Sequence, residues 1–168
     1  MTQGGLTRSL TDFADILVGR FRGGLGHTNI LGSMFFAGIT GSATADVAAI
    51  GSVLIPIMTN RGYSKAYSTA VTISGGIIGP IIPPSLTFII YALAVGRVSI
   101  GGLFMAGIAP GILVGLGLMY VNYRVSKKRN YEKRTEHYSW TKILTTTRNS
   151  LIVLIMPALI VGGILSGI

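Results

Sequence analysis

Apolar residues dominate four stretches of the 168-residue chain, and shorter polar segments separate them. About 20 apolar residues are enough for one helix to cross the roughly 30 Å hydrocarbon core. Only the third stretch has the length of an ordinary span, and the first two are longer than one crossing needs. The pattern predicts a cytoplasmic or interfacial linker (1–29), a re-entrant hairpin (30–59), a broken transmembrane helix (66–95), a transmembrane helix (99–123), a basic cytoplasmic loop (124–149) and the start of a further transmembrane helix (150–168).

The first stretch carries the polar sequence GITGSATAD, residues 38–46, at its centre. Arg20 and Arg22 precede this stretch, and Arg61 and Lys65 follow it. Because basic residues favour the cytoplasmic side, both ends are predicted to lie there. The stretch then enters the membrane and turns back, with arms of about 11 to 13 residues that each rise half the membrane. A polar tip at that depth is tolerated only beside a protein-lined or water-filled cavity, which is typical of transporters.

The second stretch contains SGGIIGPIIPPS, residues 74–85, which no regular helix accommodates. Pro80, Pro83 and Pro84 lack the backbone N–H and collide with the preceding turn. The residue before each proline is pushed out of the helical region as well. This span is therefore predicted to be two half-helices joined by an unwound link, crossing outward to Arg97 before the third stretch returns.

Composition places the chain in the membrane and excludes several functions. Charged residues make up 11% of the chain, against about a quarter in soluble domains. Eight of the fourteen basic residues lie within 124–148, which indicates a cytoplasmic loop and not nucleic-acid binding. The chain has no cysteine and therefore no disulfide or thiolate site. It also shows no His/Glu metal pair, nucleophile–base set or phosphate loop, so we predict no enzyme and no cofactor.

Two kinds of polar group suggest the binding of an ion and an anion. Unwound carbonyls and hydroxyls suit a hard cation such as sodium, and the N-terminus of the second arm attracts a substrate carboxylate. Ser42 and Thr44 have the alternative of capping that arm. Asp46 is either a cap that offsets the helix dipole or part of the ion site or its surroundings. Asn29 most simply caps the first arm, and its alternative is a position just outside the ion site, supporting the ligands. Glycines of the third stretch are predicted to be packing contacts: Gly107, Gly111, Gly115 and Gly117.

Three segments together resemble a known family: SMFFAGITGSATADVAAIGSVLIPIM, GYSKAYSTAVTISGGIIGPIIPPS and SIGGLFMAGIAPGILVGLGLM. They are similar to the large membrane subunit of TRAP transporters, the tripartite ATP-independent periplasmic transporters. The resemblance implies sodium-driven import of an organic anion, such as a C4-dicarboxylate or a sialic acid, across the bacterial inner membrane by a multi-pass protein. It further implies two partners, a periplasmic binding protein and a small four-helix membrane subunit, and an elevator movement of a domain with two hairpins.

The resemblance also assigns a fold and a site. The fold class is an all-α integral membrane protein, with a re-entrant helical hairpin and a discontinuous transmembrane helix in one half of an inverted-repeat, ion-transporter-like fold. The family's sodium site corresponds to Gly41, Ser42, Gly79, Ile82 and Pro83. Neighbouring positions are predicted to lie near the substrate: Thr40, Ala43, Thr44, Pro84 and Ser85. Because the family's large subunit has two such halves, we expect this chain to need the remainder of the subunit for transport.

Departures from the family pattern leave the substrate open. The tip usually reads G-[IV]-S-G-S-A, and Thr40 here replaces the first serine while keeping a hydroxyl. Residues 74–76 and 86–87 also differ from commoner choices. Two other functions fit the residues alone. In a channel subunit the tip would form a filter and carry current independent of a gradient. In a structural subunit the broken helix would only shape packing.

Overall fold

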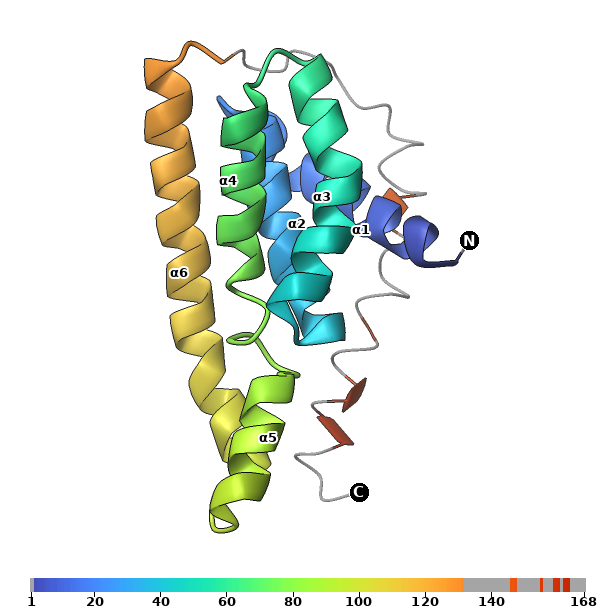
Figure 1. Ribbon diagram of the computed structural model, residues 1–168, viewed down its shortest axis with the longest axis vertical. Helices are drawn as coiled ribbons and strands as arrows, with labels where there is room; N and C mark the ends of the chain where they lie inside the picture. Colours follow the sequence, from blue (N-terminus) through green and yellow to red (C-terminus); the bar gives the residue numbers. More distant parts are fainter. Residues whose placement is uncertain (1, 132–145, 148–154, 156–158, 161, 164–168) are drawn as a thin grey trace.

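The computed structural model describes residues 2–131, together with 146–147, 155, 159–160 and 162–163. Residues 2–131 form a set of helices (Figure 1): α1 (Thr2–Val18), α2 (Gly24–Thr40), α3 (Ala43–Asn60), α4 (Lys65–Gly76), α5 (Leu86–Val95) and α6 (Ile100–Lys128). This confirms the all-α prediction. The predicted basic loop after Tyr131, and most of the predicted span at 150–168, lie outside the described residues.

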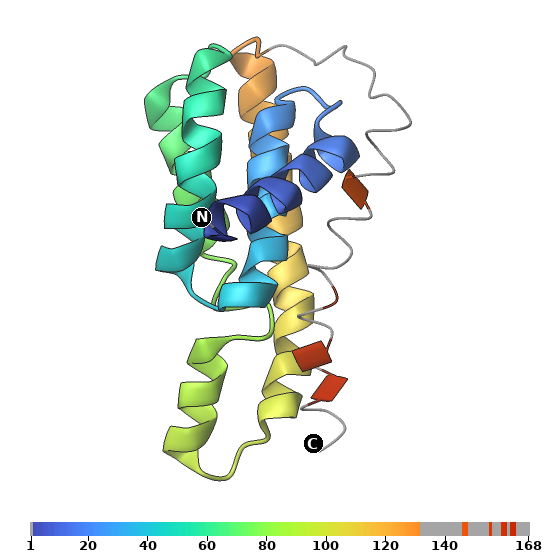
Figure 2. The ribbon, with the colours of Figure 1, turned by 90° about the vertical axis from the view of Figure 1, so that its right-hand side faces the viewer.

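Helix α2 is the centre of the fold, because it packs against α1, α3, α4 and α6. Figures 1 and 2 show α2, α3, α4 and α6 lying alongside one another, while α1 crosses them steeply. Two apolar clusters fill the spaces between them. One joins α1, α2 and α3 and includes Leu10, Phe36 and Ile50. The other joins α2 to α4 and the link after it, and includes Ile30 and Val71.

The segment predicted as a linker, 1–29, is largely helical. Thr7, Leu10, Thr11 and Ala14 are buried. They recur at helical spacing, so they form one stripe that packs on the neighbouring helices. The segment predicted as a linker therefore contains a helix, α1, whose buried stripe packs against α2 and α3.

The hairpin consists of α2 and α3, joined by Gly41 and Ser42. Its arms have 17 and 18 residues, longer than the predicted 11 to 13. The first arm begins early because its polar start is buried by tertiary contacts. A side chain at Gly26, for example, would collide with Asn122 of α6. Glycine therefore lets the two helices approach closely, and the helix extends beyond the apolar run.

The predicted break in the second stretch is present between α4 and α5, over residues 77–85. Ser85 begins α5 by accepting a hydrogen bond on its hydroxyl from the Phe88 N–H, at 3.3 Å. The Pro83–Pro84 peptide bond is cis. In Figure 2, α5 lies beyond the hairpin tip, beside the first part of α6.

Helix α6 continues to Lys128, five residues past the predicted end of its span. Lys127 and Lys128 in its last turn complement the negative end of the helix dipole. The prediction that the glycines of this helix are packing contacts is confirmed for some of them. Gly111 and Gly115 face Ile82 and Met34, whereas Gly117 has open space around it.

Candidate functional site

The hairpin tip lies directly against the break between α4 and α5. Gly41 has the left-handed backbone conformation, with φ 60°. A Cβ atom there would lie 2.6 Å from the Pro84 carbonyl oxygen and 2.8 Å from the Leu86 amide nitrogen. Only glycine fits so close to another backbone, and only glycine adopts this conformation readily. The two segments predicted separately from the sequence therefore meet through their main chains.

A second close approach joins the break to the start of α3. A Cβ atom at Gly79 would collide with the Asp46 carboxylate and lie 3.2 Å from the Ala43 amide nitrogen. At Gly76 it would lie 3.1 Å from the Ala43 carbonyl oxygen. The first turn of α3 is thus enclosed by glycines of the second stretch. Polar backbone groups from both segments occupy one small region.

Asp46 lies at the centre of this region and is fully buried. Its Oδ1 accepts a hydrogen bond from the Thr40 hydroxyl at the end of the first arm. Its Oδ2, beside Gly79, has no hydrogen-bond partner in the described residues. A buried carboxylate oxygen without a partner is costly. Asp46 therefore ties the two arms together and leaves one oxygen available to a cation or water.

The hydroxyls at the tip are not used as helix caps. Ser42 occupies the N-cap position of α3, but its side chain makes no capping hydrogen bond. Its Oγ lies 3.1 Å from the Thr44 Oγ1, and its N–H donates to the Thr40 Oγ1 at 3.3 Å. Ser42 is half-buried and Thr44 is exposed. The capping alternative for Ser42 is therefore not realised.

Residues of the break contribute in different ways. The Ile82 side chain packs in the apolar cluster and against Gly111, so only its backbone carbonyl is free to serve an ion. Pro83 is buried. Ser85 is also buried, and its hydroxyl donates to the Pro80 carbonyl at 2.7 Å. This hydroxyl is already committed to capping α5, which argues against its predicted place beside the substrate.

Asn29 does not cap the first arm, because α2 begins five residues earlier. Its side chain is fully buried, and its Nδ2 donates to the Thr72 Oγ1 at 2.8 Å and to the Met58 sulfur at 3.7 Å. It thus connects α2 with α4 and α3. The sequence carried a usable signal, since Asn29 and Ser33 are four residues apart on one helical face, as are Ser68 and Thr72.

A cation at this site would depend on few charged ligands. The described residues contain no group of three His, Cys, Asp or Glu side chains that could hold a metal ion. The available oxygens are one carboxylate, several hydroxyls and the carbonyls of the break. Such a set of oxygens suits a hard cation better than a transition metal.

The whole chain, residues 1–168, matches the family described as "Tripartite ATP-independent periplasmic transporter, DctM component". Three curated relatives show how far the similarity extends. A sialic acid TRAP transporter permease protein of Haemophilus influenzae is 40% identical over 168 residues, which are 100% of this chain and 27% of that protein. A C4-dicarboxylate TRAP transporter large permease protein of Pseudomonas aeruginosa is 42% identical over 169 residues, 99% of this chain and 39% of that protein. An isethionate TRAP transporter permease protein of Oleidesulfovibrio alaskensis is 42% identical over 168 residues, 100% of this chain and 26% of that protein.

Proposed function

The chain belongs to the DctM component family of tripartite ATP-independent periplasmic (TRAP) transporters, and we propose that it forms part of the permease of a sodium-coupled importer of a small organic anion. It spans less than two fifths of the relatives named above, so transport is a property of the longer protein. The observation that carries the proposal is the contact between the hairpin tip and the helix break, with a buried carboxylate oxygen left open between them.

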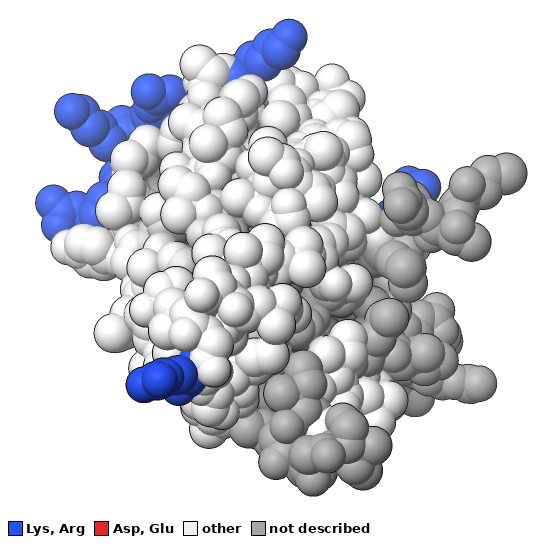
Figure 3. Space-filling model, turned by 60° about the horizontal axis from the view of Figure 1, so that its bottom comes forward, with Lys and Arg blue, Asp and Glu red and all other residues white. Residues whose placement is uncertain are grey.

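The proposal places the hairpin in the membrane as a re-entrant element. The start of α2, the end of α3, the start of α4 and the end of α6 lie at one end of the helix group (Figure 1), and that end carries the basic residues of the described chain except Arg8 and Arg97. Basic ends favour one cytoplasmic side for all four. Figure 3 shows a face of the molecule on which Lys and Arg lie only at the margins of a broad uncharged surface. That surface suits lipid or other membrane segments.

The contacts of the break with α6 support a proposed depth for the break and for the hairpin tip that contacts it. A Cβ atom at Gly107 would lie 2.5 Å from the Ile81 carbonyl oxygen, and one at Gly111 the same distance from the Ile82 side chain. These glycines lie about 10 to 17 Å from the start of α6, at 1.5 Å per residue. In a hydrocarbon core near 30 Å thick, the break and the hairpin tip would lie near the midplane. Transporters hold ions and substrates at this depth.

In this proposal sodium is held between the two segments. Ser42 and Asp46 from the hairpin, together with backbone carbonyls of the break near Gly79, Ile82 and Pro83, are the candidate ligands. The unpartnered Asp46 Oδ2 supports the assignment, because a cation would remove the cost of leaving that oxygen buried alone. Sodium supplies positive charge, and the protein supplies a shaped set of oxygens.

The substrate is proposed to be an anion, bound beside the same junction. Helices α3 and α5 both begin next to it, so their N-terminal amides present partial positive charge near the tip. The three relatives are named for sialic acid, C4-dicarboxylate and isethionate, all of them small anions. Thr40, Ala43, Thr44 and Pro84 are the proposed neighbours of the substrate.

The remaining parts of the proposal come from the family. A periplasmic binding protein would deliver the anion, and a small membrane subunit would accompany the permease in the bacterial inner membrane. The rest of the large subunit would complete the site, and the hairpin domain would move as an elevator. We propose no bond-breaking step, because transport requires none.

The test is uptake of a radiolabelled C4-dicarboxylate or sialic acid into proteoliposomes that contain the complete permease, the small subunit and the binding protein. We expect uptake that requires an inward sodium gradient, and a higher sodium concentration for half-maximal uptake in Ser42→Ala. Ser52→Ala is the matched control, since Ser52 is an exposed serine of α3 whose hydroxyl donates only to the Ala49 carbonyl. Uptake indifferent to sodium, or equal sodium curves for both variants, would refute the proposal.

A further inference from the structure

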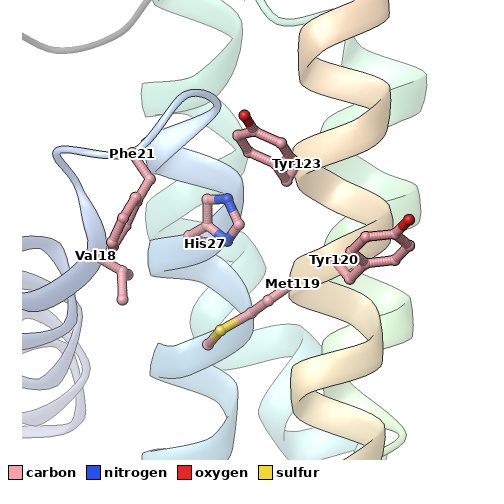
Figure 4. A pocket seen from close by; sticks show the side chains of 6 residues that line it. All are labelled: Val18, Phe21, His27, Met119, Tyr120 and Tyr123. Carbon is pink, nitrogen blue, oxygen red and sulfur yellow. The ribbon is translucent and has the colours of Figure 1, made fainter.

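A recess lies away from the hairpin tip, between the start of α2 and the last third of α6 (Figure 4). Its volume is about 240 Å³, and it is lined by Val18, Phe21, His27, Met119, Tyr120 and Tyr123. The lining is almost entirely apolar or aromatic. The recess lies at the end of the helix group that carries the basic residues, which the proposed function places at the cytoplasmic surface.

One buried polar atom beside this recess lacks a partner. The His27 side chain is 6% exposed, and its Nε2 has no hydrogen-bond partner in the described residues. The other ring nitrogen is engaged, because the ring hydrogen-bonds the Arg22 backbone. In a neutral imidazole that donates from Nδ1, Nε2 is an acceptor. Figure 4 shows the ring between Phe21 on one side and the α6 side chains on the other. The Nε2 atom lies beneath the lining, because the surface that the recess presents is wholly apolar, so an occupant meets apolar groups there and not the imidazole nitrogen.

The charge around the recess is strongly positive. Residues 15–31 and 119–131 contain a single acidic residue, Asp15, whose Oδ1 accepts a hydrogen bond from Thr28. They contain six basic residues: Arg20, Arg22, Arg124, Lys127, Lys128 and Arg129. The Arg124 guanidinium lies 5.8 Å from the ring centre of Tyr120, a residue of the lining, and donates to its hydroxyl at 2.9 Å. Positive charge at the margin of an apolar recess complements an anionic headgroup.

An apolar path leads from the recess along α6. Tyr120, Leu116 and Leu113 are 60%, 57% and 69% exposed, and their spacing of four and three residues places them on one face of the helix. Phe21 is exposed as well, and aromatic residues of this kind gather at membrane interfaces. The path runs from the basic end toward the middle of α6. An acyl chain that starts in the recess would follow it into the hydrocarbon core.

We propose that this recess binds one anionic phospholipid of the phosphatidylglycerol type, with the phosphate beside Arg124 and an acyl chain in the recess and along α6. Phosphatidylglycerol combines the two required features, which are a net negative charge and an apolar chain. Phosphatidylcholine has no net charge, so it meets only the second. The site is separate from the proposed ion site and holds whether or not sodium drives transport.

The test is lipid titration of the purified complete permease, with its small subunit, followed by native mass spectrometry. We expect saturable binding of one phosphatidylglycerol, at least about tenfold tighter than phosphatidylcholine. This comparison uses the wild-type protein and does not depend on the folding of a variant. Equal affinity for the two lipids, or no saturable binding, would overturn the proposal.

A pair of variants then locates the site. Arg124→Gln should weaken phosphatidylglycerol binding about tenfold, because it removes the charge beside the recess. Lys65→Gln is the matched control, since it removes one exposed positive charge at the same end of the molecule, at the start of α4. An equal loss in both variants would show only general attraction between basic residues and anionic lipid, and would overturn the proposed site.

Discussion

Replacing Gly41 with alanine tests the contact that carries the proposed function. The new Cβ would lie 2.6 Å from the Pro84 carbonyl oxygen, whereas an ordinary contact needs 3.4 Å, so the two backbones must separate by about 0.8 Å. All three nearest atoms belong to the main chain and cannot rotate away. Overpacking of this kind costs about 1 to 3 kcal/mol, and the left-handed conformation costs an alanine about 1 to 2 kcal/mol more.

The functional effect should exceed the effect on stability. A shift of nearly 1 Å between groups that must act together can reduce a rate on the order of 100-fold. We therefore expect Gly41→Ala to lose most sodium-driven uptake in proteoliposomes of the complete transporter, while a substantial fraction of the protein still purifies as a folded complex.

Gly62→Ala is the matched control for this experiment. Gly62 also has a left-handed backbone, with φ 83°, but a Cβ atom there would meet nothing within 4 Å. The Gly62→Ala variant should therefore lose only the stability that the left-handed conformation costs an alanine, and should retain sodium-driven uptake. Wild-type sodium activation in Gly41→Ala would refute the idea that the tip and the break form the site. An equal loss of uptake in both variants would show that the left-handed backbone conformation alone causes the effect.

Three further predictions concern other contacts. Asn29→Ala removes a buried interhelical hydrogen bond and should destabilise the permease by about 1 to 3 kcal/mol, seen as a lower melting temperature; an unchanged melting temperature would contradict the role of Asn29. Gly111→Ala should lower the melting temperature, because its new Cβ would clash with Ile82 of the break. Gly117→Ala has open space around it and should leave the melting temperature unchanged or raise it. Equal changes in melting temperature for the two variants would contradict this packing. Asp46→Asn keeps the shape of the side chain but removes its charge, so half-maximal uptake should need more sodium, and an unaltered sodium curve would exclude Asp46 as a ligand.

Breaks in the helices were predictable because their causes are local. Prolines at 80, 83 and 84 lie within five residues of one another, so together they remove three backbone N–H groups from one short segment, and the structure has its link there. Single prolines at 56 and 110 remain inside α3 and α6, so the local cause of the break is the clustering of the prolines. The turn at Gly41 was predictable for a related reason, since glycines and hydroxyl residues interrupt an apolar run there. Helix ends were less predictable, because burial against neighbouring helices decides whether polar residues join a helix. The early start of α2 at Gly24 is the clearest case.

The composition of the site depended on contacts that the sequence does not record. Which residue of the break meets Gly41 is set by how the helices pack, and neither segment alone specifies it. The error on Asn29 has the same origin, because its partner Thr72 is 43 residues away. Ser85 is different. A serine just before an apolar helical run is a favoured N-cap, so its capping role could have been predicted from the sequence.

The junction suggests how an ion and an anion would be coupled under the proposed function. Its two halves come from separate parts of the chain, and they approach through glycines at 41, 76 and 79. A cation held between the hairpin and the break would fix the N-termini of α3 and α5 relative to each other. These are the two positive helix ends that an anion would need in place together. Sodium would therefore raise the affinity for substrate by ordering its site, and by linkage the substrate would raise the affinity for sodium by the same factor.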